Sequence, residues 1–280
     1  MAAPARLDAV TADGVRLALT RTPPRGSGRG AALLTHAMMV DGRYLGRLAA
    51  ALADADLDVF VLDWRGHGAS RPPDPRGGGW SFDDYVGLDL PCALAAVARA
   101  AGVDRRAVGL VGHSLGGLVA LAALGTGTVA VDRVALLATS VWLRGPRWRR
   151  ALMRTYRGVA TAVGHAPIRA LRLGTADEPA RYVAQLAGWC TTGRWAALDG
   201  RDYLAAVASV DARVSAWAGA GDWMCTPADA RALLDALPAA PPLRVVGRAH
   251  GDAVDADHFT LVTRPALAPV WRDLAAALAP

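Results

Sequence analysis

The residues best suited to covalent chemistry lie in the stretch 108–120, where an apolar run breaks at Gly-His-Ser-Leu-Gly and a second apolar run follows. A strand that turns sharply into a helix at Ser114 would lift its hydroxyl oxygen clear of the sheet, where it can attack a carbonyl carbon. A Cβ at Gly112 or Gly116 would collide with the neighbouring strand and helix, so the turn requires glycine at both positions. The flanking strand and helix favour a nucleophile elbow over a glycine-rich turn with an incidental serine.

The same turn predicts a place for developing negative charge. The backbone N–H of Leu115 would lie at the N-terminus of the following helix and point to where an oxyanion forms. A serine hydroxyl is a poor nucleophile at neutral pH, so it needs a histidine to accept its proton and a carboxylate to orient that histidine. Other elements of the chain must therefore bring a histidine and an acidic side chain to the elbow.

The composition bounds the class of protein. The chain has 280 residues, of which 53% are hydrophobic, and no stretch is polar enough to link two domains, so we expect one domain with an insertion. It has no uninterrupted apolar run of about 18 residues or more, and residues 1–24 lack the apolar block that drives secretion. We expect a soluble, cytoplasmic protein without stable membrane insertion. Cys92, Cys190 and Cys225 lack metal-ligand spacing and are too few for a disulfide framework, so free thiols are expected.

The basic charge of the chain is local. The formal net charge is +6, and all 31 basic residues are arginine, which together with abundant alanine is typical of coding bias in a GC-rich genome. Residues 141–208 hold 11 Arg against 4 Asp or Glu, so this segment is +7 and the remainder is −1. The segment lacks any motif that recognises bases or a phosphate backbone, so we do not expect nucleic acid as a partner.

Strands and helices alternate along most of the chain. The runs 7–11 and 15–21 flank Asp13-Gly14, a turn pair typical of a β-hairpin. The strands that we predict after it are 31–35, 58–62, 107–111, 133–138, 214–218 and 243–246, and the helices are 44–54, 82–100, 115–124, 227–237 and 265–279. This alternation predicts right-handed βαβ units and an α/β fold, with a mostly parallel sheet covered by helices on both faces.

A long segment interrupts the alternation. One predicted strand ends near residue 138 and the next begins near residue 214. The sequence between them is too long for an ordinary connection and has helical character. We therefore predict a core of residues 1–138 and 210–280 and an inserted helical cap of residues 139–209. Four tryptophans lie in the cap, and they either line an apolar pocket or form the cap's own small core: Trp142, Trp148, Trp189 and Trp195.

With the elbow, the strand order and the cap in place, the chain resembles the α/β-hydrolase superfamily over nearly its full length. It is most similar to the capped branch of lipases, lysophospholipases and serine aminopeptidases. The resemblance implies a triad in the chain order Ser, Asp, His, with the acid after a late strand. Asp222 follows the run Ala-Trp-Ala-Gly-Ala-Gly and matches this position.

The resemblance also selects among the six histidines. The family's base lies after the last strand, about seven residues before a proline that opens the final helix, and His258 precedes Pro265 by this spacing. His250 lies in the same loop but follows the strand too closely to reach the elbow. Three others are not expected to be catalytic. His113 should pack within the elbow, His67 belongs to a loop with a structural role, and no residue pattern near His165 indicates a catalytic partner.

The second oxyanion donor should come from the loop after the strand 31–35. The family usually has His-Gly-x here, whereas this chain has His36-Ala37-Met38. By position, the N–H of Met38 would be the donor and His36 would brace the loop. Alanine in place of glycine changes the shape of the loop but leaves the N–H in place.

The predicted enzyme is a serine hydrolase that cleaves a carboxylic ester with a hydrophobic acyl or aromatic portion through an acyl-enzyme. It needs no metal or organic cofactor, and its partner is a small-molecule ester or thioester. A thioesterase or acyltransferase with the same triad is the alternative, and a binding protein on a retired hydrolase fold is a second one. Four arginines of the cap either face solvent or guide an anionic substrate: Arg144, Arg147, Arg149 and Arg150. The sequence does not indicate an oligomeric state.

Overall fold

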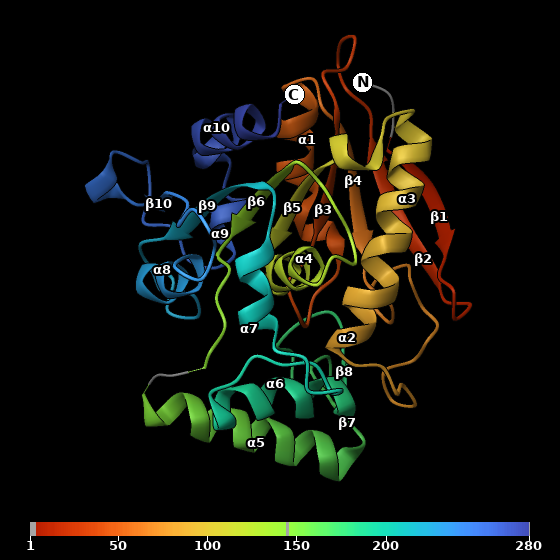
Figure 1. Cartoon of the computed structure of the whole chain (residues 1–280), viewed down its shortest axis with the longest axis vertical. Coiled ribbons are helices and arrows are strands. Elements are labelled where there is room, and N and C mark those ends of the chain that lie inside the picture. The colour runs from red at the N-terminus through yellow and green to blue at the C-terminus, as the bar shows by residue number, and fades with distance from the viewer. Residues whose placement is uncertain (1–3, 144–145, 280) are drawn as a thin grey trace.

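An eight-stranded sheet forms the centre of the computed structural model, which describes residues 4–143 and 146–279 (Figure 1). Its strands, in spatial order, are β1 (Ala5–Val10), β2 (Arg16–Thr22), β4 (Asp58–Asp63), β3 (Ala31–Thr35), β5 (Gly109–His113), β6 (Arg133–Leu137), β9 (Arg213–Gly219) and β10 (Leu243–Val246). The first two strands form the predicted antiparallel hairpin, and β2 is also antiparallel to β4. All other neighbouring pairs are parallel, so the predicted mostly parallel sheet is confirmed.

Helices cover both faces of this sheet. Every residue of β3, β5 and β6 is buried, as expected for strands packed on two sides. Alternate residues of β3 point to opposite faces: Leu33 packs in the cluster that includes α3 (Leu90–Ala101) and α4 (Leu115–Gly125), and Leu34 packs in the cluster that includes α1 (Gly46–Asp54) and α10 (Ala268–Leu278). The smaller helical elements are η1 (Gly42–Leu45), α2 (Phe82–Asp84), η2 (Tyr85–Asp89), η3 (Arg105–Ala107), α8 (Pro227–Leu234), η5 (Arg248–His250), α9 (Thr260–Thr263) and η6 (Pro265–Leu267).

The chain between β6 and β9, here named the β6–β9 segment (residues 138–212), is mainly helical. It holds α5 (Arg147–Val163), β7 (His165–Ala166), β8 (Glu178–Pro179), α6 (Ala180–Thr192), α7 (Tyr203–Ala206) and η4 (Val207–Ser209). The first and longest helix, α5, packs along α6, and Figure 1 shows the pair below the sheet. None of the helices in the described ranges 4–143 and 146–279 has the length and apolar character needed to cross a membrane.

The four tryptophans of this segment divide between two roles. Trp195 is fully buried and Trp189 nearly so, and both rings pack against Phe82 of α2, at centroid distances of 6.4 Å and 4.9 Å. These two therefore pack in the buried cluster that the segment shares with α2, α3 and α4. In contrast, 46% of Trp148 is exposed, and Trp142 is partly buried and donates its indole N–H to the backbone of Met224.

The arginines predicted to face solvent or to guide substrate do not behave as one group. Arg149 is buried, its guanidinium makes two hydrogen bonds of 2.9 Å and 2.7 Å to Asp229, and it lies 4.6 Å from the ring of Trp142. The prediction was wrong for this residue, because its charge is neutralised inside the protein. Arg147 is exposed, and Arg144 lies outside the described residues.

Candidate active site

The turn between β5 and α4 has the geometry that the glycine spacing predicts. Ser114 has φ +53° and ψ −113°, an unusual conformation for a residue with a side chain, and it is partly exposed. A Cβ on Gly112 would lie 2.6 Å from the backbone carbon of Gly116, at the start of α4. A Cβ on Gly116 would lie 2.7 Å from the carbonyl oxygen of Thr35, at the end of β3. Close approach of helix and strand is therefore the reason for both glycines.

Asp222 and His258 meet although 36 positions separate them. His258 Nδ1 donates a hydrogen bond of 2.8 Å to Asp222 Oδ2, and both side chains are buried. The other carboxylate oxygen of Asp222 accepts the N–H groups of Met224 and Cys225, each at 2.8 Å. These three bonds hold the carboxylate in place after β9, so it can fix the orientation and tautomer of the imidazole.

The elbow holds His258 through His113. His113 Nε2 donates to the backbone oxygen of His258 at 2.8 Å, and the two ring centroids lie 5.0 Å apart. In the part of the chain that the structure describes, Ser114 Oγ makes no hydrogen bond to His258. Hydrogen bonds between nucleophile and base are often long before substrate binds.

A chain of hydrogen bonds continues from His113 to the loop after β3. The N–H of Ala37 donates to the hydroxyl of Tyr44 at 2.8 Å, and this hydroxyl lies 2.6 Å from His113 Nδ1. Because His113 Nε2 carries the proton donated to His258, its Nδ1 must accept the hydroxyl proton of Tyr44. Burial lowers the pKa of His113 well below its ordinary value, and the neighbouring His258 lowers this pKa further, so the ring is neutral. The expectation that His113 merely packs was therefore incomplete.

The loop after β3 carries the second predicted oxyanion donor. The N–H groups of Met38 and Leu115 have no hydrogen-bond partner among the described residues, so both are available to a ligand. His36 braces the loop as predicted: its Nδ1 donates to the carbonyl oxygen of Ala37 at 2.7 Å, and its Nε2 accepts the N–H of Trp64 at 3.1 Å. Burial lowers the pKa of His36 to about 3, with His67 as a second cause, so this ring is also neutral.

The remaining histidines lie outside this arrangement. His250 is exposed in η5, directly after β10, as its position in the sequence predicts. His165 is in β7, and His67 is fully buried in the loop after β4. Two residues that contact the site were missed in the sequence: Tyr44, which lies 69 positions from His113, and Glu178, which accepts the N–H of Met39 from 139 positions away. Neither belongs to a local pattern that could have revealed it.

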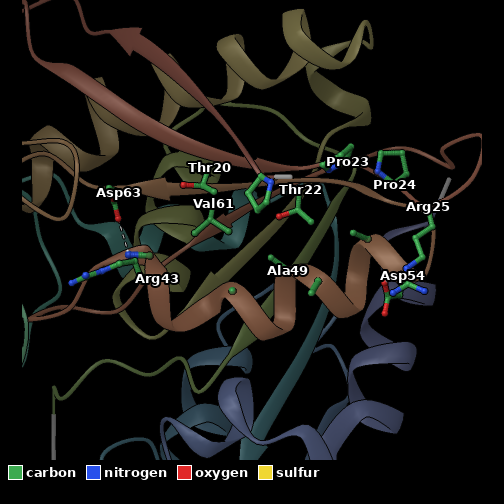
Figure 2. Close-up of a pocket in the computed structure, with 15 residues that line it drawn as sticks. Thr20, Thr22, Pro23, Pro24, Arg25, Arg43, Ala49, Asp54, Val61 and Asp63 are labelled. Carbon is green, nitrogen blue, oxygen red and sulfur yellow. Dashed lines mark hydrogen bonds and ion pairs between the residues drawn. The ribbon is translucent and has the colours of Figure 1, made fainter. Parts of the chain in front are cut away.

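A groove of about 800 Å³ lies elsewhere on the molecule (Figure 2). Figure 2 shows it between α1 and the strands β2 and β4, with the ion pair of Arg25 and Asp54 at one end. Its lining includes none of the predicted triad or oxyanion residues, so it is separate from the elbow.

Comparisons with known proteins agree with this architecture. The sequence profile of the family described as serine aminopeptidase, S33, matches residues 26–243. A thermophilic esterase from Thermogutta terrifontis is 19% identical over 99% of this chain and 100% of its own, with a TM-score of 0.65. The thioesterase domain from the curacin biosynthetic pathway is 14% identical over 99% of each chain, with a TM-score of 0.61. An enol-lactonase from Burkholderia xenovorans is 19% identical over 97% of this chain and 99% of its own, with a TM-score of 0.60. No sequence among curated proteins matches the chain.

Proposed function

Because the chain belongs to the serine aminopeptidase S33 family of α/β hydrolases, we propose that Ser114, His258 and Asp222 form a catalytic triad that hydrolyses a carboxylic ester. The observation that carries the proposal is the 2.8 Å hydrogen bond between His258 and Asp222, made beside a serine held at positive φ. A buried carboxylate that orients a histidine next to a strained serine is the arrangement that activates a hydroxyl for attack.

The proposed reaction has two halves. In the first, His258 Nε2 accepts the proton of Ser114 Oγ as this oxygen attacks the ester carbonyl, and then gives the proton to the departing alcohol, which leaves an acyl-enzyme. In the second, His258 takes a proton from water, the resulting hydroxide attacks the acyl carbon, and the proton returns to Ser114 as the acid is released. Asp222 stabilises the imidazolium in both halves. The N–H groups of Leu115 and Met38 hold the oxyanion, each worth about 2.7–4 kcal/mol in comparable enzymes.

The proposed substrate is a small ester with an apolar acyl or aromatic portion, bound between a core of residues 1–138 and 210–280 and a cap of residues 139–209. The core packing of Trp189 and Trp195 leaves Trp142 and Trp148 as the tryptophans of the cap with surface to offer a ligand. A thioester is the second candidate substrate, since the chain shares its fold with both an esterase and a thioesterase domain. Fold alone does not choose between them.

The test is covalent labelling followed by a substrate panel. A fluorophosphonate should label the wild-type protein, and Ser114→Ala should lose both labelling and hydrolysis while its circular dichroism stays unchanged, because alanine can adopt the same backbone conformation. The kcat/KM values of an ester, a thioester and an amide that share the same acyl group then rank the leaving groups. Hydrolysis by Ser114→Ala at the wild-type rate would overturn the proposed nucleophile, and a higher kcat/KM for the thioester would transfer the proposal to the second candidate.

A further inference from the structure

Glu178 is a fully buried carboxylate where the β6–β9 segment meets the loop after β3. It lies in β8, and its Oε1 accepts the N–H of Met39 at 2.6 Å. Isolated buried charges are strongly unfavourable, so a glutamate in such a place needs partners that compensate for its lost hydration. The partners it has are in the core and not in its own segment.

Both backbone polar groups of Met39 are bound by the β6–β9 segment. Its N–H donates to Glu178, and its carbonyl oxygen accepts the N–H groups of Thr175 at 2.9 Å and Ala176 at 3.0 Å. Met39 has φ +65°, in the left-handed region that residues with a side chain rarely adopt. Such a conformation persists only where the surroundings hold it, and here residues 175–178 do so.

These bonds set the direction of the neighbouring Met38 N–H. That N–H lies in the same peptide plane as the carbonyl of Ala37, which His36 holds at 2.7 Å. The next peptide plane contains the N–H of Met39, which Glu178 holds. Met38 therefore sits between two restrained peptides, one restrained by the core and the other by β8.

The second partner of Glu178 is His67. His67 Nδ1 donates to the carbonyl oxygen of Arg65 at 2.9 Å, and its Nε2 lies 3.3 Å from Glu178 Oε1. With Nδ1 protonated, the contact is attractive only if Nε2 also carries a proton or the carboxyl does. Burial lowers the pKa of His67, but the Glu178 carboxylate, the carbonyl oxygen of Arg65 and the charge of Asp63 together raise it above the ordinary value. Glu178 Oε2 has no hydrogen-bond partner in the described ranges, so the carboxylate bonds only to the loop and to His67.

We propose that Glu178 is a positioning residue for the oxyanion hole, because it ties the Met38–Met39 backbone to β8 and so aims the Met38 N–H at the carbonyl oxygen under attack. The inference rests on the proposed serine hydrolase function. It adds that the oxyanion hole is complete only when the β6–β9 segment is docked on the core.

Two variants of Glu178 separate hydrogen bonding from packing. Glutamine can still accept the N–H of Met39 with its side-chain oxygen, so Glu178→Gln should keep kcat close to wild type. Glu178→Leu has a similar volume but no acceptor. Its kcat should fall by about 10²-fold, the scale of losing one oxyanion donor, with KM little changed. Affinity for a trifluoromethyl ketone, whose adduct with the serine carries an oxyanion, should fall by the same factor as kcat/KM.

Asp177 provides the matched control. It is the adjacent residue, also buried, and it accepts the backbone N–H and the guanidinium of Arg169 at 2.8 Å and 3.0 Å, within its own segment. Asp177→Leu therefore removes a buried carboxylate from the same place without touching the loop after β3. Its loss of unfolding free energy should resemble that of Glu178→Leu, while its kcat should stay near wild type.

Equal kcat in Glu178→Leu and Asp177→Leu would overturn the inference, as would an effect confined to KM. If Glu178→Leu does not fold, Glu178→Asp decides, because the shorter side chain keeps the charge but draws the acceptor away from the N–H of Met39. The aspartate variant should then show the loss in kcat, and wild-type kcat in it would also overturn the inference. If Ser114→Ala still hydrolyses the ester, the proposed function itself is refuted. Failure of the inference about Glu178 can therefore be told apart from failure of the proposed function.

Discussion

The hydroxyl of Tyr44 lies 2.6 Å from His113 Nδ1 and links the two loops that must meet at Ser114. On one side it accepts the N–H of Ala37, in the loop that presents Met38. On the other, His113 donates to the backbone of His258. A single hydroxyl thus connects the proposed oxyanion loop to the proposed base, and it makes the elbow histidine a bridge between them.

Tyr44→Phe should lower both stability and activity. It leaves the Ala37 N–H and His113 Nδ1 buried without a partner, and each unsatisfied group typically costs about 1–3 kcal/mol of unfolding free energy. Urea unfolding measures this loss, and kcat should fall because both loops lose a restraint. Tyr85→Phe is the control, since that buried hydroxyl accepts the indole N–H of Trp80 at 2.8 Å, away from the triad. A stable Tyr44→Phe with wild-type kcat would show that the bridge has no role in positioning.

His258→Ala should lose about 10³-fold or more in kcat/KM, because members of a triad act as a unit. His250→Ala should change it little, since His250 is exposed in η5 while His258 is bonded to Asp222. Both variants can be assayed with one chromogenic ester, with thermal unfolding as a check on folding. The reverse ranking would mean that the base has been assigned to the wrong histidine.

The local parts of the site could be predicted from the sequence, and the long-range parts could not. The elbow is a local pattern, because Gly112, Ser114 and Gly116 lie within five positions and their geometry follows from sterics. The bond of Tyr44 to His113 and the bond of Glu178 to Met39 join residues 69 and 139 positions apart, so only the folded chain brings them together.

The same reason explains why side-chain roles in the β6–β9 segment could not be assigned from the sequence. Arg149 looks like one of several basic surface residues until the fold brings Asp229 against it, 80 positions away. The sequence leaves a pocket role and a core role open for the four tryptophans, and the contacts with Phe82 of α2 show that Trp189 and Trp195 are buried core residues. Composition indicates what a segment contains, whereas burial depends on which other elements pack against it.

Acidification should destabilise the protein through His36. Its pKa in the folded protein is about 3, against 6.5 for an unperturbed histidine, so the unfolded chain binds a proton at pH values where the folded protein does not. The stability that this neutral ring provides is full above pH 6.5 and is lost as the pH falls towards 3. Between pH 7 and pH 5 the loss should be about 2 kcal/mol. Unfolding free energies of the wild type and of His36→Gln at the two pH values measure it, and the variant should lose about 2 kcal/mol less than the wild type. Equal pH dependence in both proteins would mean that His36 does not titrate in this way.

Esters with a medium-chain or aromatic acyl group should be hydrolysed faster than acetate esters of the same alcohol. Each methylene buried in the site should add about 0.8 kcal/mol, or roughly fourfold in kcat/KM, until the pocket is full. Arg149 should not steer anionic substrates, because Asp229 neutralises it, so any steering would come from the exposed arginines of α5. Without steering, anionic and neutral esters should show the same small response to ionic strength, whereas steering would make kcat/KM fall with salt for the anionic ester alone. If acetate esters are the better substrates at equal leaving group, the β6–β9 segment does not provide apolar walls, and the proposed function reduces to a serine hydrolase for small acyl groups.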